Sequence, residues 1–324
     1  MTTERLLVLG QRAHALPVEE YAAELESRLP DWDVTLARTP AAEREEIEDA
    51  TVVTGIRIGE DLLEHADQLR YFACGAAGVD HLPLDRLEER GVAVSNASGV
   101  HGPNMAEHVL GWFLMFTRRL DEAVRRTERG VWQRFQSHEL QGSTVTVVGL
   151  GVIGQAITER LEGFGVDTIG VRYTPEKGGP TDEVIGFETE PFHEALARTD
   201  YLVLACPLTD TTRGLIGSEE LRVLPPDAVL VNVGRGPIVD TDALVRSLRR
   251  NELRGVGLDV THPEPLPADH PLWQFDSVQI TSHSSGHTPE YWARLADVVA
   301  ENVRRIDRTG RFDDLENQVL VPPT

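Results

Sequence analysis

The stretch Thr144-Val-Thr-Val-Val-Gly149-Leu-Gly151-Val-Ile-Gly154-Gln-Ala-Ile157 decides the fold. Its β-branched run from Val145 to Val148 is typical of a buried strand, and three glycines follow at G-x-G-x-x-G spacing before a helical pattern. In such a unit the first glycine permits the turn, the second lets backbone approach a pyrophosphate, and the third lets helix pack on strand. The helix N-terminus then offers unpaired N–H groups to the phosphates. The sequence therefore predicts a dinucleotide-binding domain.

The residue after the next predicted strand, Asp167–Val171, bears on which dinucleotide binds. An acidic residue commonly stands about 20 residues past the glycines, where it bonds the ribose hydroxyls of NAD. Arg172 stands there instead, followed by Tyr173 and Thr174. An arginine pairs with the 2′-phosphate of NADP, which a carboxylate repels. We expect NADP(H) to be preferred and NAD(H) to remain possible; the alternative is a solvated surface arginine.

Composition limits the partners. The chain has 324 residues, enough for two domains, with 53 acidic and 31 basic residues and a formal charge of −22. Lys177 is the only lysine. This balance argues against nucleic acid and anionic membrane, because both are polyanions. It favours a protein from a salt-loving organism, whose surface carboxylates stay hydrated at high ionic strength; an ordinary acidic protein from a GC-rich genome is the alternative.

The cysteines and the apolar runs indicate a cytoplasmic protein. Cys74 and Cys206 lie far apart in strand-like contexts without metal-ligand spacing, so we expect buried free thiols, a reducing compartment and no metal site. The apolar run near the N-terminus is too short for a signal peptide. The longest apolar run, Val109–Phe116, is too short for a membrane span.

Short strands alternate with amphipathic helices along the chain, as in βαβ units. The pattern up to about residue 100 predicts five strands: Leu6–Leu9, Val34–Ala37, Thr51–Thr54, Tyr71–Cys74 and Val92–Ser95. The pattern around and after the glycines predicts six: Val145–Val148, Asp167–Val171, Tyr201–Ala205, Val229–Val233, Val256–Asp259 and Val278–Thr281. We therefore expect two parallel sheets, the second doubly wound.

Two predicted helices stand out. One, from Asn104 to Gly130, is apolar enough to pack on a second subunit as well as on its own domain, with burial inside one subunit as the alternative. The other, from Pro289 to about Thr309, is amphipathic.

Gly75-Ala-Ala-Gly78-Val-Asp80 follows a predicted strand end. Ligands of open α/β sheets bind at that edge, so the backbone amides of Ala77 and Gly78 could hold a small carboxylate. A simple turn is the alternative.

Three side chains with catalytic potential each follow a strand's carboxyl end. Arg235, beside two glycines, suits a carboxylate because its planar fork makes two parallel hydrogen bonds. His283 suits proton transfer near neutral pH, and Glu264, between two prolines, would favour its protonated form. As a set on one sheet edge they indicate chemistry. His287 and His262 are rival proton carriers, further from their strand ends.

In the order and spacing of these motifs, the sequence resembles the D-isomer-specific 2-hydroxyacid dehydrogenases over nearly its whole length. The resemblance rests on Ala76-Ala-Gly78-Val-Asp80, Ala106-Glu107, the glycine motif, Cys206-Pro-Leu-Thr209 with Thr212, Asn232 with Arg235-Gly236 and Asp240, Asp259-Val260 with Glu264-Pro265, and Thr281 with His283.

The resemblance implies reduction of a 2-oxoacid to a D-2-hydroxyacid, with Arg235 orienting the oxoacid, His283 protonating its carbonyl oxygen and Glu264 supporting the histidine. It implies an α/β fold of two Rossmann-like domains, in which a doubly wound dinucleotide-binding domain (101–287) is inserted into a smaller flavodoxin-like substrate domain (1–100 and 288–324). Dimers held by the cofactor domains are usual in the family. The cofactor shell that the residues and the resemblance together indicate comprises Asn104, Gly149, Gly151, Val152, Ile153, Gly154, Arg172, Tyr173, Thr174, Cys206, Pro207, Thr212, Val233 and Asp259.

Departures from the family pattern shape the alternatives. Arg172 replaces the acidic residue, and in this the chain resembles the NADP-using glyoxylate/hydroxypyruvate reductases and the branched 2-oxoacid reductases. Ser282 replaces the proline that commonly precedes the histidine. Formate dehydrogenases of this fold pair the histidine with glutamine, so Glu264 argues against formate. A dinucleotide-sensing corepressor or scaffold of the same fold is a further alternative.

Overall fold

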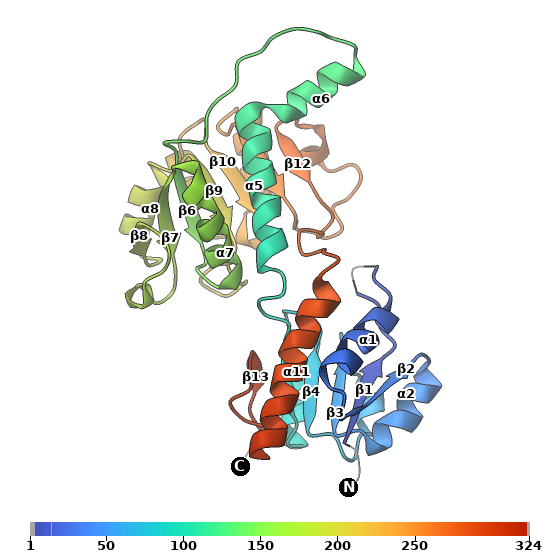
Figure 1. The fold of residues 1–324 in the computed structure, drawn as a ribbon. Coiled ribbons are helices and arrows are strands. Elements are labelled where there is room, and N and C mark those ends of the chain that lie inside the picture. The colour runs from blue at the N-terminus through green and yellow to red at the C-terminus, as the bar shows by residue number, and fades with distance from the viewer. Residues whose placement is uncertain (1–3, 14, 323–324) are drawn as a thin grey trace. The chain divides into compact units, whose positions relative to one another are not determined.

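The computed structural model describes residues 4–13 and 15–322, and the chain divides into two compact units. Unit 1 comprises residues 1–100 and 287–324, and unit 2 comprises residues 101–286. Each is a sheet of parallel strands, with one antiparallel edge strand in unit 1, and is covered by helices on both faces (Figure 1). His287, which the sequence analysis places with the dinucleotide-binding domain, falls in unit 1.

Unit 1 has the strand order β13-β5-β4-β3-β1-β2. Strands β1 to β5 are mutually parallel and lie in the order β5-β4-β3-β1-β2, which is the flavodoxin-like order. The predicted five strands are therefore present, and the order confirms the flavodoxin-like domain. Their bounds are β1 Arg5–Leu9, β2 Asp33–Ala37, β3 Val52–Gly55, β4 Tyr71–Cys74 and β5 Ala93–Ser95.

Both faces of this sheet are covered. Leu6 and Val8 face the layer that contains α1 (Val18–Arg28) and α11 (Tyr291–Thr309), whereas Leu7 and Leu9 face the opposite layer. Tyr21 of α1 stacks on Trp292 of α11 with ring centroids 4.6 Å apart. The opposite layer comprises α2 Pro40–Glu46, α3 Glu60–Leu63 and α4 Leu84–Glu89.

Unit 2 is a doubly wound sheet with strand order β12-β11-β10-β9-β6-β7-β8. All its pairings are parallel, and the order reverses between β6 and β9, where open α/β sheets bind ligands. The strands are β6 Thr144–Val148, β7 Asp167–Val171, β8 Glu183–Ile185, β9 Tyr201–Leu204, β10 Val229–Asn232, β11 Gly255–Leu258 and β12 Val278–Ile280.

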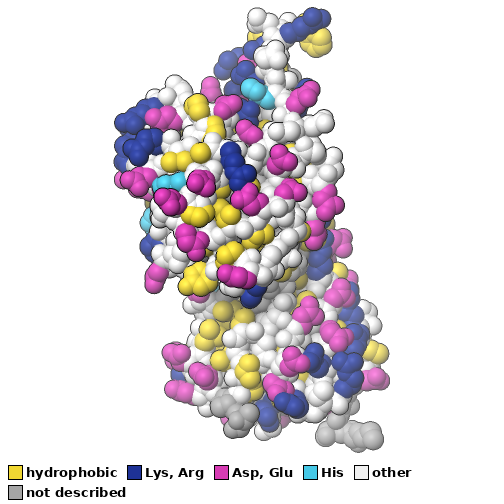
Figure 2. All heavy atoms as spheres, turned by 90° about the vertical axis from the view of Figure 1, so that its left-hand side faces the viewer, with side chains coloured by type: hydrophobic (Ala, Val, Ile, Leu, Met, Phe, Trp, Pro, Cys, Tyr) yellow, Lys and Arg dark blue, Asp and Glu magenta, His cyan; other side chains and the backbone are white. Residues whose placement is uncertain are grey.

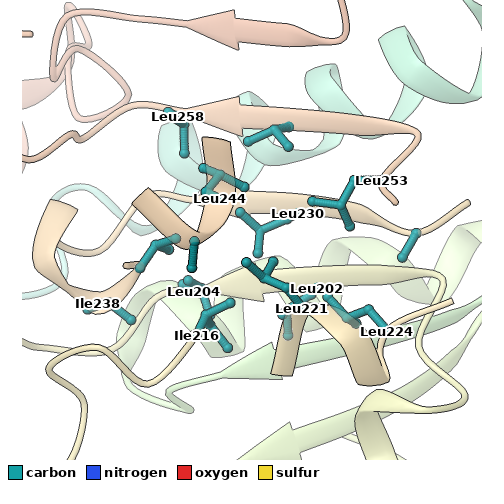
Figure 3. Packing of buried hydrophobic residues seen from close by; sticks show 14 of the residues in the cluster. Leu202, Leu204, Ile216, Leu221, Leu224, Leu230, Ile238, Leu244, Leu253 and Leu258 are labelled. Carbon is teal, nitrogen blue, oxygen red and sulfur yellow. The ribbon is translucent and has the colours of Figure 1, made fainter. Parts of the chain in front are cut away.

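Successive residues of the central strands alternate between two cores. Tyr201 and Val203 pack with α5 (Gly102–Arg118) and α7 (Val152–Leu161). Leu202 and Leu204 pack on the other face, where Figure 3 shows them with leucines of β10, β11 and the covering helices. Those helices are α8 Thr189–Leu196, α9 Ser218–Val223 and α10 Thr241–Arg249.

Three predictions about elements were wrong. The predicted helix from Asn104 to Gly130 is two helices, α5 and α6 (Leu120–Glu128), because Arg119 adopts a left-handed conformation with φ of 50°. Unit 2 has seven strands rather than six, since β8 adds an edge. Unit 1 gains β13 (Gln318–Leu320), which pairs antiparallel with β5.

Acidic side chains are spread over both units on the face in Figure 2 rather than gathered in one patch. Within residues 4–13 and 15–322, no helix has the length and apolarity to cross a bilayer. In unit 2, α6 and the segment after it project beyond the other elements (Figure 1). Exposed apolar side chains are concentrated there, namely Leu120, Val124, Val131 and Trp132.

Candidate active site and dinucleotide site

The glycine turn joins β6 to α7 and needs each glycine for a separate reason. Gly149 has φ of +99°, and a Cβ there would lie 2.7 Å from the Cα of Cys206. A Cβ at Gly154 would lie 1.9 Å from the carbonyl oxygen of Gly149. Gly151, by contrast, has open space where a Cβ would be. Two glycines thus allow close packing, and the third leaves room beside the turn.

That space lies at the N-terminus of α7, where a dinucleotide pyrophosphate would fit. Gly151 is the N-cap and supplies no side-chain acceptor for the first N–H groups of the helix. Val152 is 46% exposed and Ile153 is half-buried. Free N–H groups and the positive end of the helix dipole suit an anion at this point. The residues present therefore fit a dinucleotide.

Arg172 follows β7, at the strand end next to the glycine turn. One of its Nη atoms donates a hydrogen bond to the carbonyl oxygen of Gly178, so the guanidinium lies against its own loop. Among the described residues Arg172 forms no ion pair with a carboxylate. Tyr173 and Thr174 are exposed beside it. The guanidinium therefore retains donors for an anionic group.

The remaining predicted cofactor residues of unit 2 differ in accessibility. Cys206 and Val233 are buried, and burial raises the pKa of the Cys206 thiol to about 11. The Thr212 hydroxyl is also buried and donates to the carbonyl oxygen of Pro207 at 2.7 Å, which stabilises the turn after β9. Asn104 donates from Nδ2 to the carbonyl oxygen of Ser285 at 2.8 Å.

Two of the predicted catalytic side chains are hydrogen-bonded to each other. His283 Nδ1 lies 2.7 Å from Glu264 Oε1, and the side chains are 52% and 42% exposed. They come from the loops after β12 and β11, which are neighbouring parallel strands. With Nδ1 bonded to the carboxylate, Nε2 is the ring nitrogen that is left to exchange a proton with a ligand.

Arg235 lies after β10, next in the sheet to β11. Its side chain is exposed, and Nη1 donates to the carbonyl oxygen of Gly234 at 2.9 Å. The following glycine packs tightly, because a Cβ at Gly236 would lie 1.9 Å from the carbonyl oxygen of Thr261. The Arg235 loop is thereby fixed against the loop that carries Glu264.

Neither rival histidine shares this arrangement. The His262 side chain is exposed, and its backbone carbonyl accepts a hydrogen bond from Thr241 Oγ1 at 3.1 Å. His287 belongs to unit 1, whereas His283 and Glu264 belong to unit 2.

Asp259, buried to 2% exposure, organises the segment that carries His283. Its Oδ1 accepts from Thr281 Oγ1 at 2.6 Å and from Ser284 N at 2.8 Å, and its Oδ2 accepts from Ser285 Oγ at 2.5 Å. Its backbone oxygen accepts from His283 N at 2.8 Å. The sequence pattern gives no separate role to the donors Thr281 and Ser285; the hydroxyl side chains on both sides of His283 are the signal that could have identified them.

The predicted carboxylate cradle lies at the carboxyl end of β4 in unit 1. Its first residue, Gly75, is packed so closely that a Cβ would lie 2.8 Å from Ile56 Cδ1. The carbonyl oxygen of Ala77 accepts from Asn96 Nδ2 at 2.7 Å. Ala77 is exposed and Gly78 is half-buried. The packing at Gly75 and the hydrogen bond from Asn96 therefore fix this turn, while Ala77 and Gly78 remain accessible to solvent.

A doubly wound sheet with this glycine turn at its switch point defines a dinucleotide-binding α/β protein. Its family is shown by comparison with known proteins. The family model "D-isomer specific 2-hydroxyacid dehydrogenase, NAD binding domain" matches residues 110–285, more than half of the chain. The chain therefore belongs to the D-isomer specific 2-hydroxyacid dehydrogenases, which confirms the predicted family.

Two curated relatives and one crystal structure illustrate the similarity. The D-3-phosphoglycerate dehydrogenase of Methanocaldococcus jannaschii is 31% identical over 94% of this chain, which spans 59% of that relative's length. The glyoxylate reductase of Pyrococcus furiosus is 33% identical over a region that covers 76% of this chain and 75% of the reductase. The NADPH-dependent glyoxylate/hydroxypyruvate reductase of Sinorhizobium meliloti has a TM-score of 0.77 and 27% identity, covering 99% of both chains.

Proposed function

We propose that this protein reduces small 2-oxoacids to D-2-hydroxyacids with NADPH. The observation that carries the proposal is the 2.7 Å hydrogen bond between His283 and Glu264 at the carboxyl edge of the dinucleotide-binding sheet. A carboxylate beside an imidazole fixes its tautomer and stabilises its charged form, as a general acid requires. Family membership supports the same reaction class.

Each residue has a distinct role in this reaction. When bound, the nicotinamide supplies the hydride that reduces the carbonyl carbon. His283 Nε2 donates a proton to the carbonyl oxygen, and Glu264 stabilises the imidazolium before that transfer. Arg235 binds the carboxylate of the oxoacid through its guanidinium. The amides of Ala77 and Gly78 are a second candidate group for a carboxylate.

NADPH is the proposed reductant because a cation follows β7 where NAD-binding folds carry an acid. Arg172 and the exposed Tyr173 and Thr174 would contact the 2′-phosphate end. The similar Sinorhizobium meliloti reductase is NADPH-dependent, which supports this choice. NAD(H) remains a possible substitute with lower affinity.

Small oxoacids such as glyoxylate are the proposed substrates, since relatives named glyoxylate reductase align with most of this chain. Glu264 beside His283 argues against formate oxidation, for which the family resemblance implies glutamine. A dinucleotide-sensing corepressor or scaffold is the second candidate, because binding does not require turnover.

We further propose a homodimer in the cytoplasm of a salt-loving cell. Trp132 is 103% exposed and Val124 is 58% exposed, so the projecting α6 region offers apolar surface that a second copy would bury. The charge of −22 favours high ionic strength and disfavours nucleic acid and anionic membranes.

The deciding experiment follows the absorbance of NADPH and NADH in parallel, with a panel of 2-oxoacids at low and multimolar KCl. NADPH oxidation that is faster in high salt would support the reaction, the cofactor preference and the salt adaptation. A folded protein that binds dinucleotide but turns over no oxoacid would instead support the sensing function.

A further inference from the structure

A chain of side-chain hydrogen bonds leads from helix α5 to the segment that carries His283. His108 Nε2 lies 3.2 Å from Thr281 Oγ1, and Thr281 Oγ1 donates to Asp259 Oδ1 at 2.6 Å. Ser285 Oγ donates to the other carboxylate oxygen of Asp259 at 2.5 Å. All of these residues belong to unit 2. None of the proposed catalytic steps uses His108 or Thr281.

The number of protons available fixes which group donates and which accepts in this series of hydrogen bonds. Thr281 Oγ1 donates to Asp259 Oδ1, so the single proton of the Thr281 hydroxyl points at that carboxylate. The Thr281 oxygen can then only accept from His108, which must carry its proton on Nε2. The geometry therefore assigns one tautomer to His108.

The surroundings of His108 favour a neutral ring in a fixed orientation. Burial lowers the pKa of His108, although the charge of Asp259 acts in the opposite direction. Its ring packs edge-on against Trp112, with centroids 4.3 Å apart. Trp112 is itself buried and lies against Gly257 of β11. His108, the first donor in this series of hydrogen bonds, is thus held by helix α5 rather than by a loop.

We propose that His108 and Thr281 are positioning residues, which orient the Asp259 carboxylate and through it the backbone of His283. His283 has a positive φ of 49°, a conformation that a non-glycine residue keeps only when its neighbours enforce it. The backbone oxygen and the carboxylate of Asp259 hold residues 283–285. A carboxylate free to rotate would release this segment. This inference rests on the proposed function only for its kinetic test.

The kinetic test compares two substitutions of the same hydroxyl. Thr281→Val keeps the shape and removes the donor to Asp259, whereas Thr281→Ser keeps the donor. We expect Thr281→Val to lower kcat by roughly tenfold or more, the scale of effect of small misplacements, with activity retained in Thr281→Ser. Thr146→Val is the matched control, because Thr146 is buried and its hydroxyl bonds Thr199 within the sheet.

The second test needs no turnover. Long-range proton–nitrogen NMR of protein labelled at histidine nitrogen distinguishes the two neutral tautomers and the cation, and His108→Gln assigns the signal. We expect the neutral Nε2–H form at pH 7. The Nδ1–H form would overturn the proposed hydrogen bonds, because Nε2 could then not donate to Thr281. A Thr281→Val enzyme with the kcat of Thr281→Ser would overturn the positioning role. Wild-type protein without turnover would refute the proposed function alone, and the tautomer would still decide the hydrogen-bond chain.

Discussion

His283 Nδ1 and Glu264 Oε1 are 2.7 Å apart, and their hydrogen bond joins the loops that follow two adjacent parallel strands, β11 and β12. Since both loops leave the same sheet edge, the pair forms without any strand having to bend. The histidine keeps Nε2 for a ligand, and the carboxylate stays partly exposed to solvent.

Removal of the imidazole should abolish most turnover. His283→Ala is expected to lower kcat by roughly 10²–10⁴-fold, the usual contribution of a positioned acid. Glu264→Gln keeps a hydrogen-bonding group and removes the charge, so we expect a loss of about 1.5–3 kcal/mol, roughly ten- to a hundredfold in kcat. Steady-state kinetics with NADPH measure both. Wild-type rates in His283→Ala would transfer the role to another histidine, and His262→Ala serves as the control.

Reversal of charge at Arg172 should change the cofactor preference. Arg172→Asp is expected to lower the ratio of kcat/KM for NADPH to that for NADH by roughly ten- to a hundredfold, since a charged hydrogen bond is replaced by repulsion. Arg198→Asp makes the same charge change at a surface residue that pairs with Glu183, so it should leave the ratio unaltered. An unchanged ratio in Arg172→Asp would mean that the guanidinium only stabilises its own loop.

A methyl group at Gly236 should disturb the loop that carries Arg235. The added Cβ would lie 1.9 Å from the carbonyl oxygen of Thr261, and backbone cannot yield as a flexible side chain would. We expect Gly236→Ala to raise the KM for the oxoacid and to lower Tm. Gly163→Ala is the control, because nothing lies within 4 Å of its Cβ, and it should be neutral or gain up to about 1 kcal/mol. Equal Tm values would contradict the close packing.

Both thiols should be inert in the folded protein and should destabilise it in alkali. Burial raises the pKa of Cys74 and of Cys206 to about 11, from 9.0. Below pH 9 the thiols are protonated in both states, whereas between pH 9 and about 11 only the unfolded thiols ionise. The free energy of unfolding should therefore fall as pH rises through this window, less steeply in Cys206→Ala. Urea titrations across pH 9 measure it; fast alkylation of native protein at neutral pH would disprove the burial.

The projecting region should control the oligomeric state. Trp132→Ser removes the most exposed apolar side chain there, and we expect sedimentation velocity to show a shift from dimer to monomer. Trp273→Ser, at a tryptophan that is 50% exposed and bonded through Nε1 to its own loop, should leave the dimer intact. An unaltered dimer in Trp132→Ser would place the interface elsewhere.

Much of the fold follows from local signals. Runs such as Val145–Val148 are buried on both faces and so are β-branched and mostly apolar, which makes them recognisable without any partner. The two missed strands, β8 and β13, lie at the edges of their sheets and have only three residues each, too few to show an alternating pattern. The break at Arg119 was equally hidden, since arginine is a good helix former and nothing in the pattern indicates a left-handed residue.

The candidate site was predictable where chemistry determines residue type. Arg235, Glu264 and His283 could be chosen because each follows a strand end with a functional side chain. His108 could not, because it reads as one helical position among apolar neighbours, and its role depends on a contact with Thr281, 173 residues away. Long-range pairing of this kind leaves no periodic pattern in the sequence.

Unit 1 is built from both ends of the described chain, and this has a consequence for biosynthesis. Strands β1 to β5 leave the ribosome first, but one face of their sheet is covered by α11, whose Trp292, Leu295 and Val299 are buried. Unit 2 is one uninterrupted run and can complete its core while α11 is still untranslated. During synthesis, unit 2 can therefore complete its core before unit 1 does, and one apolar face of the first sheet stays partly uncovered until α11 has been made.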